Sequence, residues 1–402
     1  MKQLTMLLFL GILIVSFSSQ PAWAGKTDMK MYWKEGIRFE STDKAFKFKF
    51  GGRIMNDWAF MNGDDSVKAA VGDLQDATTE FRRARFYISG IIYDKIFFKA
   101  QYDFTDGDVD FKDVYLGLKK LPGVGKLTIG HFKEHIGLEN LTSSKYITLM
   151  ERANITAFIP SYNNGIGVFK SEMDDRLTWA VGVFLDTNAY GDEDGAESSF
   201  ASTARITGLP WYSGKDKLLH LGFAFSYREA KDGSVRFRER PESHTAPRFV
   251  DTGSFDADSE NRFGFEAAIV HGPLSVQGEY MGTKVDTLSG SDPTFSGYYA
   301  YVSYFLTGEH RVYKKSAGKF GRVKPKANFG KNRGAGAWEI AFRYSGLDLT
   351  DEAIAGGELH DITLGVNWYL NPVVRVMGNY IRADLDGVGK ANIFQTRFQI
   401  EW

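Results

Sequence analysis

Hydrophobic and polar residues alternate with a period of two along most of this chain. In residues 220–227, HLGFAFSY, the apolar side chains Leu221, Phe223, Phe225 and Tyr227 alternate with small or polar ones. Successive side chains of a β-strand point to opposite faces, so strict alternation predicts strands with one apolar and one polar face. Sixteen segments carry this pattern, and we expect strands at residues 47–60, 81–91, 95–104, 113–120, 126–132, 165–173, 176–185, 202–209, 220–227, 262–270, 274–282, 296–306, 338–345, 362–370, 373–381 and 393–402.

An even number of such strands predicts an all-β protein folded as a transmembrane antiparallel barrel. In such a barrel only alternate residues of each strand meet lipid, which explains the alternation. Barrels of about 16 to 18 strands leave an aqueous channel. Tight turns are expected at 93–94, 121–125, 174–175, 271–273 and 370–372, and mostly longer polar joints lie between them. That alternation is typical of outer-membrane barrels. Residues 307–335 depart from it, since a tight turn is due there and the segment is long and basic.

The first 24 residues predict a secretory signal peptide. A lysine and a short apolar run precede Ala22-Trp23-Ala24, after which we expect cleavage. Residues 25–402 show no linker-like change in composition, so we expect one barrel domain. No later apolar run approaches the about 20 residues that a membrane-spanning helix needs.

Composition agrees with a barrel and narrows the chemistry. The chain has 43 Gly, 32 Phe, 19 Tyr and 8 Trp, yet its mean hydropathy is −0.28, as expected when aromatic residues girdle a barrel with a polar interior. It has no cysteine, which excludes disulfides and cysteine-ligated metals. A net charge of −1 gives no indication of a nucleic-acid partner.

Enzymatic motifs are weak in this sequence. HFKEH, residues 131–135, fits the H-x-x-E-H pattern of some zinc proteases, but that site needs His131 and His135 on a helix, and the preceding run predicts a strand. No G-x-S-x-G motif occurs. We therefore expect neither an enzyme nor a cofactor.

Several arginines fall on the polar faces of expected strands. Alternation in residues 81–89, FRRARFYIS, puts Phe86 on the apolar face and Arg83 and Arg85 on the other. A charge facing lipid costs about 2–4 kcal/mol at the membrane midplane, so the polar faces must line a lumen. Pairing of such arginines with Asp57, Asp103 and Glu80 is the alternative to a role in binding.

A row of arginines is harder to explain by pairing. Arg236, Arg238 and Arg240 occupy every second position of SVRFRERPE, residues 234–242, which in an extended chain spaces them about 7 Å apart on one edge. The two nearby acids, Glu239 and Glu242, cannot both fold back onto the row and pair with its three arginines. We expect the row, within a loop at about 230–260, to line a wet conduit where passing anions screen it.

The expected joint at about 133–164 is long and carries Lys133, Lys145 and Arg152 among apolar residues. Such a composition is unlike a solvated surface loop. We expect this segment to fold into the lumen as a constriction loop.

Several stretches, in order from about residue 35 to the C-terminus, resemble the phosphate-selective porin family of Gram-negative outer membranes. They are FKFGGRI, FRRARFYISG, GLENLTSSKYITLMER, SVRFRERP, YFLTGEHRVYK, VKPK, GAWEIAFRY and ITLGVNWYLNP. The resemblance implies a homotrimer of sixteen-stranded barrels embedded in outer-membrane lipid, each passing small anions through a charged lumen.

The resemblance also implies roles for residues. The arginine ladder would be Arg236, Arg238 and Arg240; the central anion site would be Arg53, Arg82, Arg83, Arg152 and Lys145; the lysines on the periplasmic side would be Lys314, Lys315, Lys319 and Lys324. The last set lies in the long basic segment that breaks the alternation of turns. Two positions depart from the family pattern, since Asn140 stands where a lysine is expected and Lys112 where an acidic residue is expected.

We therefore expect a passive, anion-selective porin of the cell outer membrane, for phosphate or a related oxyanion. A general diffusion porin without phosphate specificity is the alternative within the same fold. An outer-membrane barrel enzyme would need a catalytic constellation that the sequence lacks, and a soluble β-sandwich or propeller would fractionate without detergent.

Overall fold

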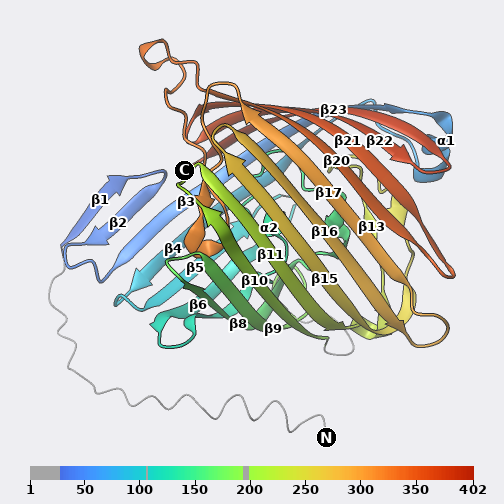
Figure 1. Ribbon diagram of the computed structural model, residues 1–402, viewed down its shortest axis with the longest axis horizontal. Coiled ribbons are helices and arrows are strands. Elements are labelled where there is room, and N and C mark those ends of the chain that lie inside the picture. Colours follow the sequence, from blue (N-terminus) through green and yellow to red (C-terminus); the bar gives the residue numbers. More distant parts are fainter. Residues whose placement is uncertain (1–27, 106, 193–198) are drawn as a thin grey trace, which may run out of the picture.

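A computed structural model of the chain describes residues 28–105, 107–192 and 199–402. The expected signal peptide lies outside the described residues. Within them, sixteen antiparallel strands form a closed barrel (Figure 1). These strands are β3 (Lys47–Gly63), β4 (Ala77–Ile92), β5 (Ile96–Asp103), β6 (Asp110–Leu121), β7 (Gly125–Lys133), β8 (Tyr162–Glu172), β9 (Leu177–Leu185), β10 (Phe200–Tyr212), β11 (Lys217–Glu229), β15 (Phe255–His271), β16 (Leu274–Thr287), β17 (Thr294–Phe305), β20 (Ala337–Asp351), β21 (Ile354–Asn371), β22 (Val374–Leu385) and β23 (Gly389–Glu401).

The barrel closes where its last strand meets its first. β23 pairs with β3 from Ala391 opposite Gly63 to Glu401 opposite Arg53. Every other strand pairs with its neighbours along the chain, and all sixteen expected strands are confirmed in type and order. Several are longer than alternation indicated, because β15 and β21 begin seven and eight residues before the expected starts at 262 and 362.

The two ends of the barrel differ in their connections. Tight turns join strands at the end where the C-terminus lies, with the long exception of 306–336. Longer loops lie at the other end, but the joints at 352–353 and 386–388 there are short as well. Short turns mark the periplasmic end of outer-membrane barrels, so the strand ends near Trp402 face the periplasm.

A hairpin that the sequence analysis missed precedes the barrel. β1 (Met29–Trp33) and β2 (Ile37–Ser41) pair with each other, and β2 continues the sheet onto the start of β3. Figure 1 shows the hairpin extending beyond the barrel wall near the C-terminus. β1 is exposed on both faces, and the alternation in β2 covers only Ile37 to Glu40, which is too short a run to indicate a strand.

The remaining elements are short. They are β12 (Ser234–Val235), β13 (Arg238–Glu239), β14 (Val250–Asp251), β18 (Tyr313–Lys314), β19 (Lys319–Phe320), the helices α1 (Asp65–Val71) and α2 (Leu138–Leu141), and the 3-10 turns Asn154–Phe158, Lys231–Gly233, Lys315–Ala317 and Lys331–Arg333. No helix in the described part of the chain is long and apolar enough to cross a membrane.

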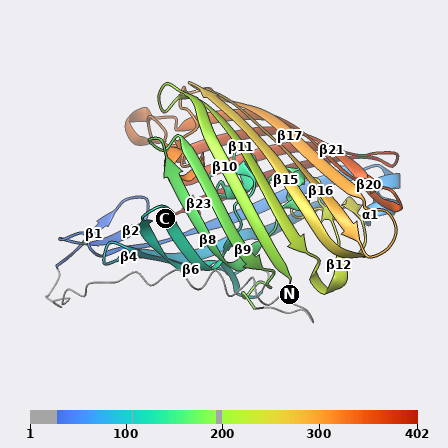
Figure 2. The same ribbon diagram turned by 60° about the horizontal axis from the view of Figure 1, so that its bottom comes forward.

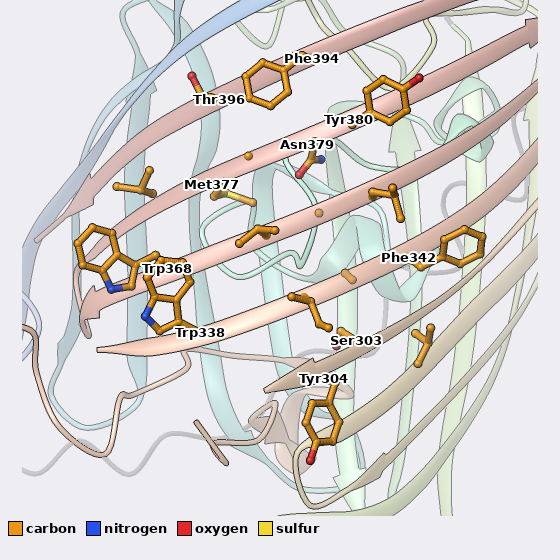
Figure 3. A pocket seen from close by; sticks show the side chains of 18 residues that line it. Ser303, Tyr304, Trp338, Phe342, Trp368, Met377, Asn379, Tyr380, Phe394 and Thr396 are labelled. Atoms are coloured by element: carbon orange, nitrogen blue, oxygen red, sulfur yellow. The ribbon is translucent and has the colours of Figure 1, made fainter. Parts of the chain in front are cut away.

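The outer wall is apolar and the inner wall polar. Along β23, Phe394, Phe398 and Ile400 are exposed, whereas Arg397 and Gln399 between them are buried. On the outside of β17 and β20–β23, an apolar depression of about 850 Å³ surrounds Gly378, where a side chain would meet only open space (Figure 3). Trp338 and Trp368 stack at one end of it with ring centroids 5.2 Å apart. This depression faces lipid, so it is separate from the polar interior.

The segment 134–161 crosses the interior of the barrel. At its start, the backbone N–H groups of Leu138 and Glu139 each donate to the Glu279 carboxylate of β16 at 2.7 Å. Farther on, Ile147 and Met150 accept hydrogen bonds through their carbonyls from the inward-facing Arg375 and Arg397. Figure 1 shows α2 within the ring of strands.

Two further segments enter the lumen. In the segment 230–254, Glu242 accepts a hydrogen bond from Ser345 of β20 at 2.6 Å and forms an ion pair with Arg343. In the segment 306–336, Tyr313 bonds His220 of β11 through its hydroxyl at 2.7 Å. The long basic segment at the periplasmic end therefore lines the interior, which explains why it is not a tight turn.

Candidate functional site

Arg82 reaches the lumen because β4 carries an extra residue at this point. Met55 of β3 pairs with Arg83, but the next residue, Asn56, pairs with Phe81. Arg82 is left unpaired, as in a β-bulge, which re-aims side chains and strengthens the local twist. Strict alternation from Arg83 would have put Arg82 on the lipid face. Only the resemblance, and not the periodicity, indicated its role.

Glu151 of the inward loop binds two neighbouring arginines of β4, Arg82 and Arg83. Its Oε1 lies 3.0 Å from Arg82 Nε and 3.6 Å from Arg83 Nη1, and Arg397 of β23 donates to the same oxygen at 2.6 Å. Burial alone would raise the pKa of Glu151, but these three guanidinium groups hold the pKa well below its usual range. Two of the five expected central residues, Arg82 and Arg83, thus share one carboxylate with Arg397, so their charges are only partly compensated.

Lys145 is neutralised in a similar way. Its Nζ lies 2.7 Å from Glu401 Oε2 at the end of β23, and both side chains are buried. Burial lowers the pKa of Lys145 to about 7, against the pull of Glu401. An ammonium in this state contributes less to anion binding than a free lysine would.

Arg53 and Arg152 have only neutral partners. Arg53 Nη1 donates to the Ser144 hydroxyl at 2.6 Å, and Arg152 donates to backbone carbonyls of the loop, at 3.0 Å for Glu139 and 2.9 Å for Thr142. Within the described residues neither guanidinium is in an ion pair. The expected central site is therefore divided, because Arg53 and Arg152 contact no carboxylate within the described residues, whereas the other three cations each contact one.

Lys133 was expected only as part of the inward loop and not in the central site. Its Nζ donates to the carbonyl and the side-chain oxygen of Asn140, at 2.9 and 2.6 Å, and it lies 5.4 Å from the ring centre of Tyr162. Asn140 is one of the two departures from the family pattern, so an ammonium from β7 stands beside the position where a lysine is expected. Both residues fall in the expected joint at 133–164, and nothing in the sequence indicates that they are in contact.

Lys112, the second departure, also lies near the Tyr162 ring. Its Nζ is 5.9 Å from the Tyr162 ring centre and forms an ion pair with Asp110 at 2.9 Å. Nearby, Arg85 forms an ion pair with Asp103 at 2.6 Å. Such pairing with Asp103 was the expected alternative to a role of the arginine in binding.

The row of arginines is less free than its spacing suggested. Arg236 forms an ion pair with Asp251 across the β13–β14 hairpin, with Nε 2.7 Å from Oδ1. Arg240 donates to the Ala246 carbonyl at 2.7 Å, and Arg238 is exposed. Phe237, between the arginines, is buried against Phe158. The expectation that nearby acids leave the row unpaired is wrong at Arg236, because the partner comes from the returning strand and not from Glu239 or Glu242.

The four expected periplasmic lysines differ in their side-chain contacts. Lys324 forms an ion pair with Glu35, and Lys315 donates to the Asp174 carbonyl at 2.9 Å. Lys314 lies 5.6 Å from the Tyr146 ring centre. Lys319 has no hydrogen-bond or ion-pair partner among the described residues, and burial lowers its pKa to about 8.

The HFKEH residues point in different directions. His131 bonds the Lys112 carbonyl at 2.8 Å, His135 stacks on Phe169, and Glu134 binds Arg228 at 2.7 Å. In the described part of the chain, no group of three or more metal-ligating side chains is placed to hold an ion.

Comparison with known sequences then decides the family. The sequence model described as "Phosphate-selective porin O and P" matches residues 48–402. The chain belongs to this family. It is a porin of the outer membrane, as the closed barrel and the polar lumen also require.

Two relatives cover most of the porin. Porin O of Pseudomonas aeruginosa is 28% identical over 405 residues, which include 91% of this chain and 89% of that protein. An uncharacterized protein of Caulobacter vibrioides is 28% identical over 387 residues, covering 93% of this chain and 76% of its own.

Solved structures share the fold of the porin at low sequence identity. OmpT of Vibrio cholerae superposes with a TM-score of 0.55 at 13% identity, covering 89% of this chain and 98% of that one. The outer-membrane channel DcaP of Acinetobacter baumannii gives a TM-score of 0.54 at 10% identity, with 90% and 99% of the two chains covered. Salmonella typhi OmpF gives 0.54 at 12% identity, with 92% and 100% covered.

Proposed function

We propose that this porin is a passive, anion-selective channel whose substrate is phosphate or a related oxyanion. The observation that carries the proposal is a group of three lumen cations, Arg53, Lys133 and Arg152, whose partners among the described residues are all neutral. Charges of one sign in a lumen with low-dielectric walls concentrate the opposite ion and speed its entry. The name of the matching family and that of Porin O support phosphate as the substrate.

Transport requires no covalent step. Guanidinium groups stay charged and match a tetrahedral oxyanion through two parallel hydrogen bonds, which gives the site its shape preference. A channel also needs weak, closely spaced sites, because an ion that binds too tightly does not leave. Under this proposal, Arg238 attracts the anion, the central cations bind it, and Lys319 receives it on the periplasmic side.

A general diffusion porin is the second candidate, and specific ion pairs favour it. Glu151 partly compensates the charges of Arg82 and Arg83, and Glu401 partly compensates that of Lys145. If these carboxylates balance the positive charge of the lumen, small ions of both signs would pass.

We further propose that the porin assembles as a homotrimer, with the apolar outer wall supplying the contact.

Planar-bilayer recordings of the purified porin test the proposal. The reversal potential in a potassium chloride gradient should show anion preference, and phosphate added to chloride should reduce the current at low concentration. Equal permeability to both ions, with no block by phosphate, would support the general diffusion porin instead.

A further inference from the structure

Tyr162 stands at the centre of a cationic cluster that extends beyond the expected central site. It is the last residue of the inward crossing and the first of β8, and it pairs with Lys133 of β7. Its ring has Lys133 and Lys112 within 6 Å of its centre, at 5.4 and 5.9 Å. An ammonium near an aromatic face is attracted to it, so the ring holds two positive charges on one site.

The donors at this cluster are not used up by the protein. Lys133 spends two of its three N–H groups on the oxygens of Asn140, and no ion pair among the described side chains satisfies its charge. The hydroxyl of Tyr162 likewise makes no hydrogen bond to the rest of the described chain, and it is not among the polar atoms sealed from solvent. An ammonium without a carboxylate partner, 5.4 Å from the centre of the Tyr162 ring, can therefore bind an anion.

The chemistry of these groups differs from that of the arginines. A guanidinium is planar and reads the shape of an oxyanion, whereas an ammonium is a compact point charge. Coulomb attraction scales with the product of the charges, so an added ammonium favours a divalent ion twice as strongly as a monovalent ion of the same shape. Asp110 and Asp113 hold Lys112 and Lys99, but neither lies within ion-pair distance of Lys133.

We propose that Lys133, Lys112 and Tyr162 form a site that selects divalent over monovalent oxyanions. The inference rests on the proposed anion channel and deepens it, because it names the charge of the preferred substrate. Arg53 and Arg152 bind either kind of oxyanion, and the ammonium pair on Tyr162 favours the more highly charged one.

Sulfate and perchlorate are suitable probes, because both are tetrahedral and differ in charge. Each is added to the full-length porin in a bilayer, and the concentration that halves the chloride current is measured. Lys133→Gln should raise that concentration about tenfold for sulfate, equivalent to about 1.4 kcal/mol, and only about threefold for perchlorate. Lys133→Arg should keep most of the sulfate block.

Lys126→Gln is the matched control. Lys126 lies on the same strand β7, and its Nζ stands 5.5 Å from the Phe169 ring centre, so the substitution removes an equivalent lysine away from Tyr162. It should change either block by less than about twofold. Equal changes for sulfate and perchlorate in Lys133→Gln, or changes no larger than those of Lys126→Gln, would overturn the inference.

Two further measurements keep the outcome decisive. If Lys133→Gln fails to assemble, Lys112→Gln must lower the preference for sulfate over perchlorate, and an unchanged preference overturns the inference. The reversal potential of the wild-type porin distinguishes a failure of the proposed function from a failure of the proposed site. A wild-type channel without anion preference contradicts the proposed function, whereas an anion-selective channel with unaltered charge preference in the lysine variants contradicts only this site.

Discussion

Replacing Glu151 by glutamine removes the one carboxylate that Arg82, Arg83 and Arg397 share. Arg397 keeps its two hydrogen bonds to Asp57, at 2.7 and 2.6 Å. Arg82 and Arg83 lose their only ion pair within the described residues. We therefore expect the variant to bind phosphate more tightly than the wild-type porin, because an anion from solution replaces the missing carboxylate.

The size of the effect follows from the bonds that become free. Arg82 makes two hydrogen bonds to Glu151, at 3.0 and 3.1 Å. One hydrogen bond to a charged group contributes about 1.5–3 kcal/mol, so a phosphate that takes up one of them should bind about 10- to 150-fold more tightly. Breaking a buried ion pair costs about 3–5 kcal/mol; hence the variant should also lose its barrel fold at a lower temperature in detergent.

The assay is the phosphate concentration that halves the chloride current through single channels. Tighter binding should lower this concentration and lengthen the blocked intervals. Glu134→Gln is the control, since Glu134 is also buried and paired, but its partner Arg228 retains Asp186 and Glu260 within 3.9 Å. A phosphate block that is unchanged or weaker in Glu151→Gln, in channels that assemble normally, refutes the view that this carboxylate competes with the substrate.

Three further predictions concern the other charged segments. Arg238→Ala should lower anion over cation permeability more than Arg236→Ala, because Asp251 already neutralises Arg236; equal effects in reversal-potential measurements would contradict this. Deletion of residues 142–149 should raise single-channel conductance and also lower heat resistance, since it removes carbonyls that satisfy buried side chains of β21–β23; unchanged conductance would show that the segment does not narrow the pore. Anion preference should fall between about pH 7 and 9 as Lys319 loses its proton, because its pKa is lowered to about 8. Lys319→Arg should remove that part of the pH dependence. The charged groups that act on Lys319 remain in both proteins; they are Asp113, Lys99, Lys314 and Arg205.

The strands were predictable because the membrane imposes the pattern. A residue such as Phe398 must be apolar where it meets lipid, and Arg397 beside it must find a polar lumen, so alternation persists along every strand of the barrel. The hairpin at residues 29–41 lies outside this constraint. β1 is exposed on both faces, and the alternation in β2 is only four residues long.

The site was predictable in residue type but not in pairing. Arg53 and Arg397 both lie on inward faces of adjoining strands, and the sequence does not distinguish them. One faces the Ser144 hydroxyl and the other faces two carboxylates. These partners come from residues 91 and 340 positions away in the chain, where periodicity carries no information. Arg82 was hidden for a different reason, since one extra residue in β4 reverses its direction.

The position of the ion path follows from where the inward loop finds its partners. Carbonyls of residues 145–150 accept hydrogen bonds from Gln399, Asn367, Arg375 and Arg397, so the loop is fastened to β21–β23. On that side the charged groups are sealed, as with Arg343 and Arg397, whose side chains are fully buried. On the wall formed by β4–β8, which Figure 2 shows across the barrel from β16–β21, Lys99, Lys112 and Asp113 keep 17–24% of their side-chain surface exposed. An ion that crosses the lumen must follow exposed charge rather than sealed charge, and it is on this wall that Lys133 and Tyr162 lie.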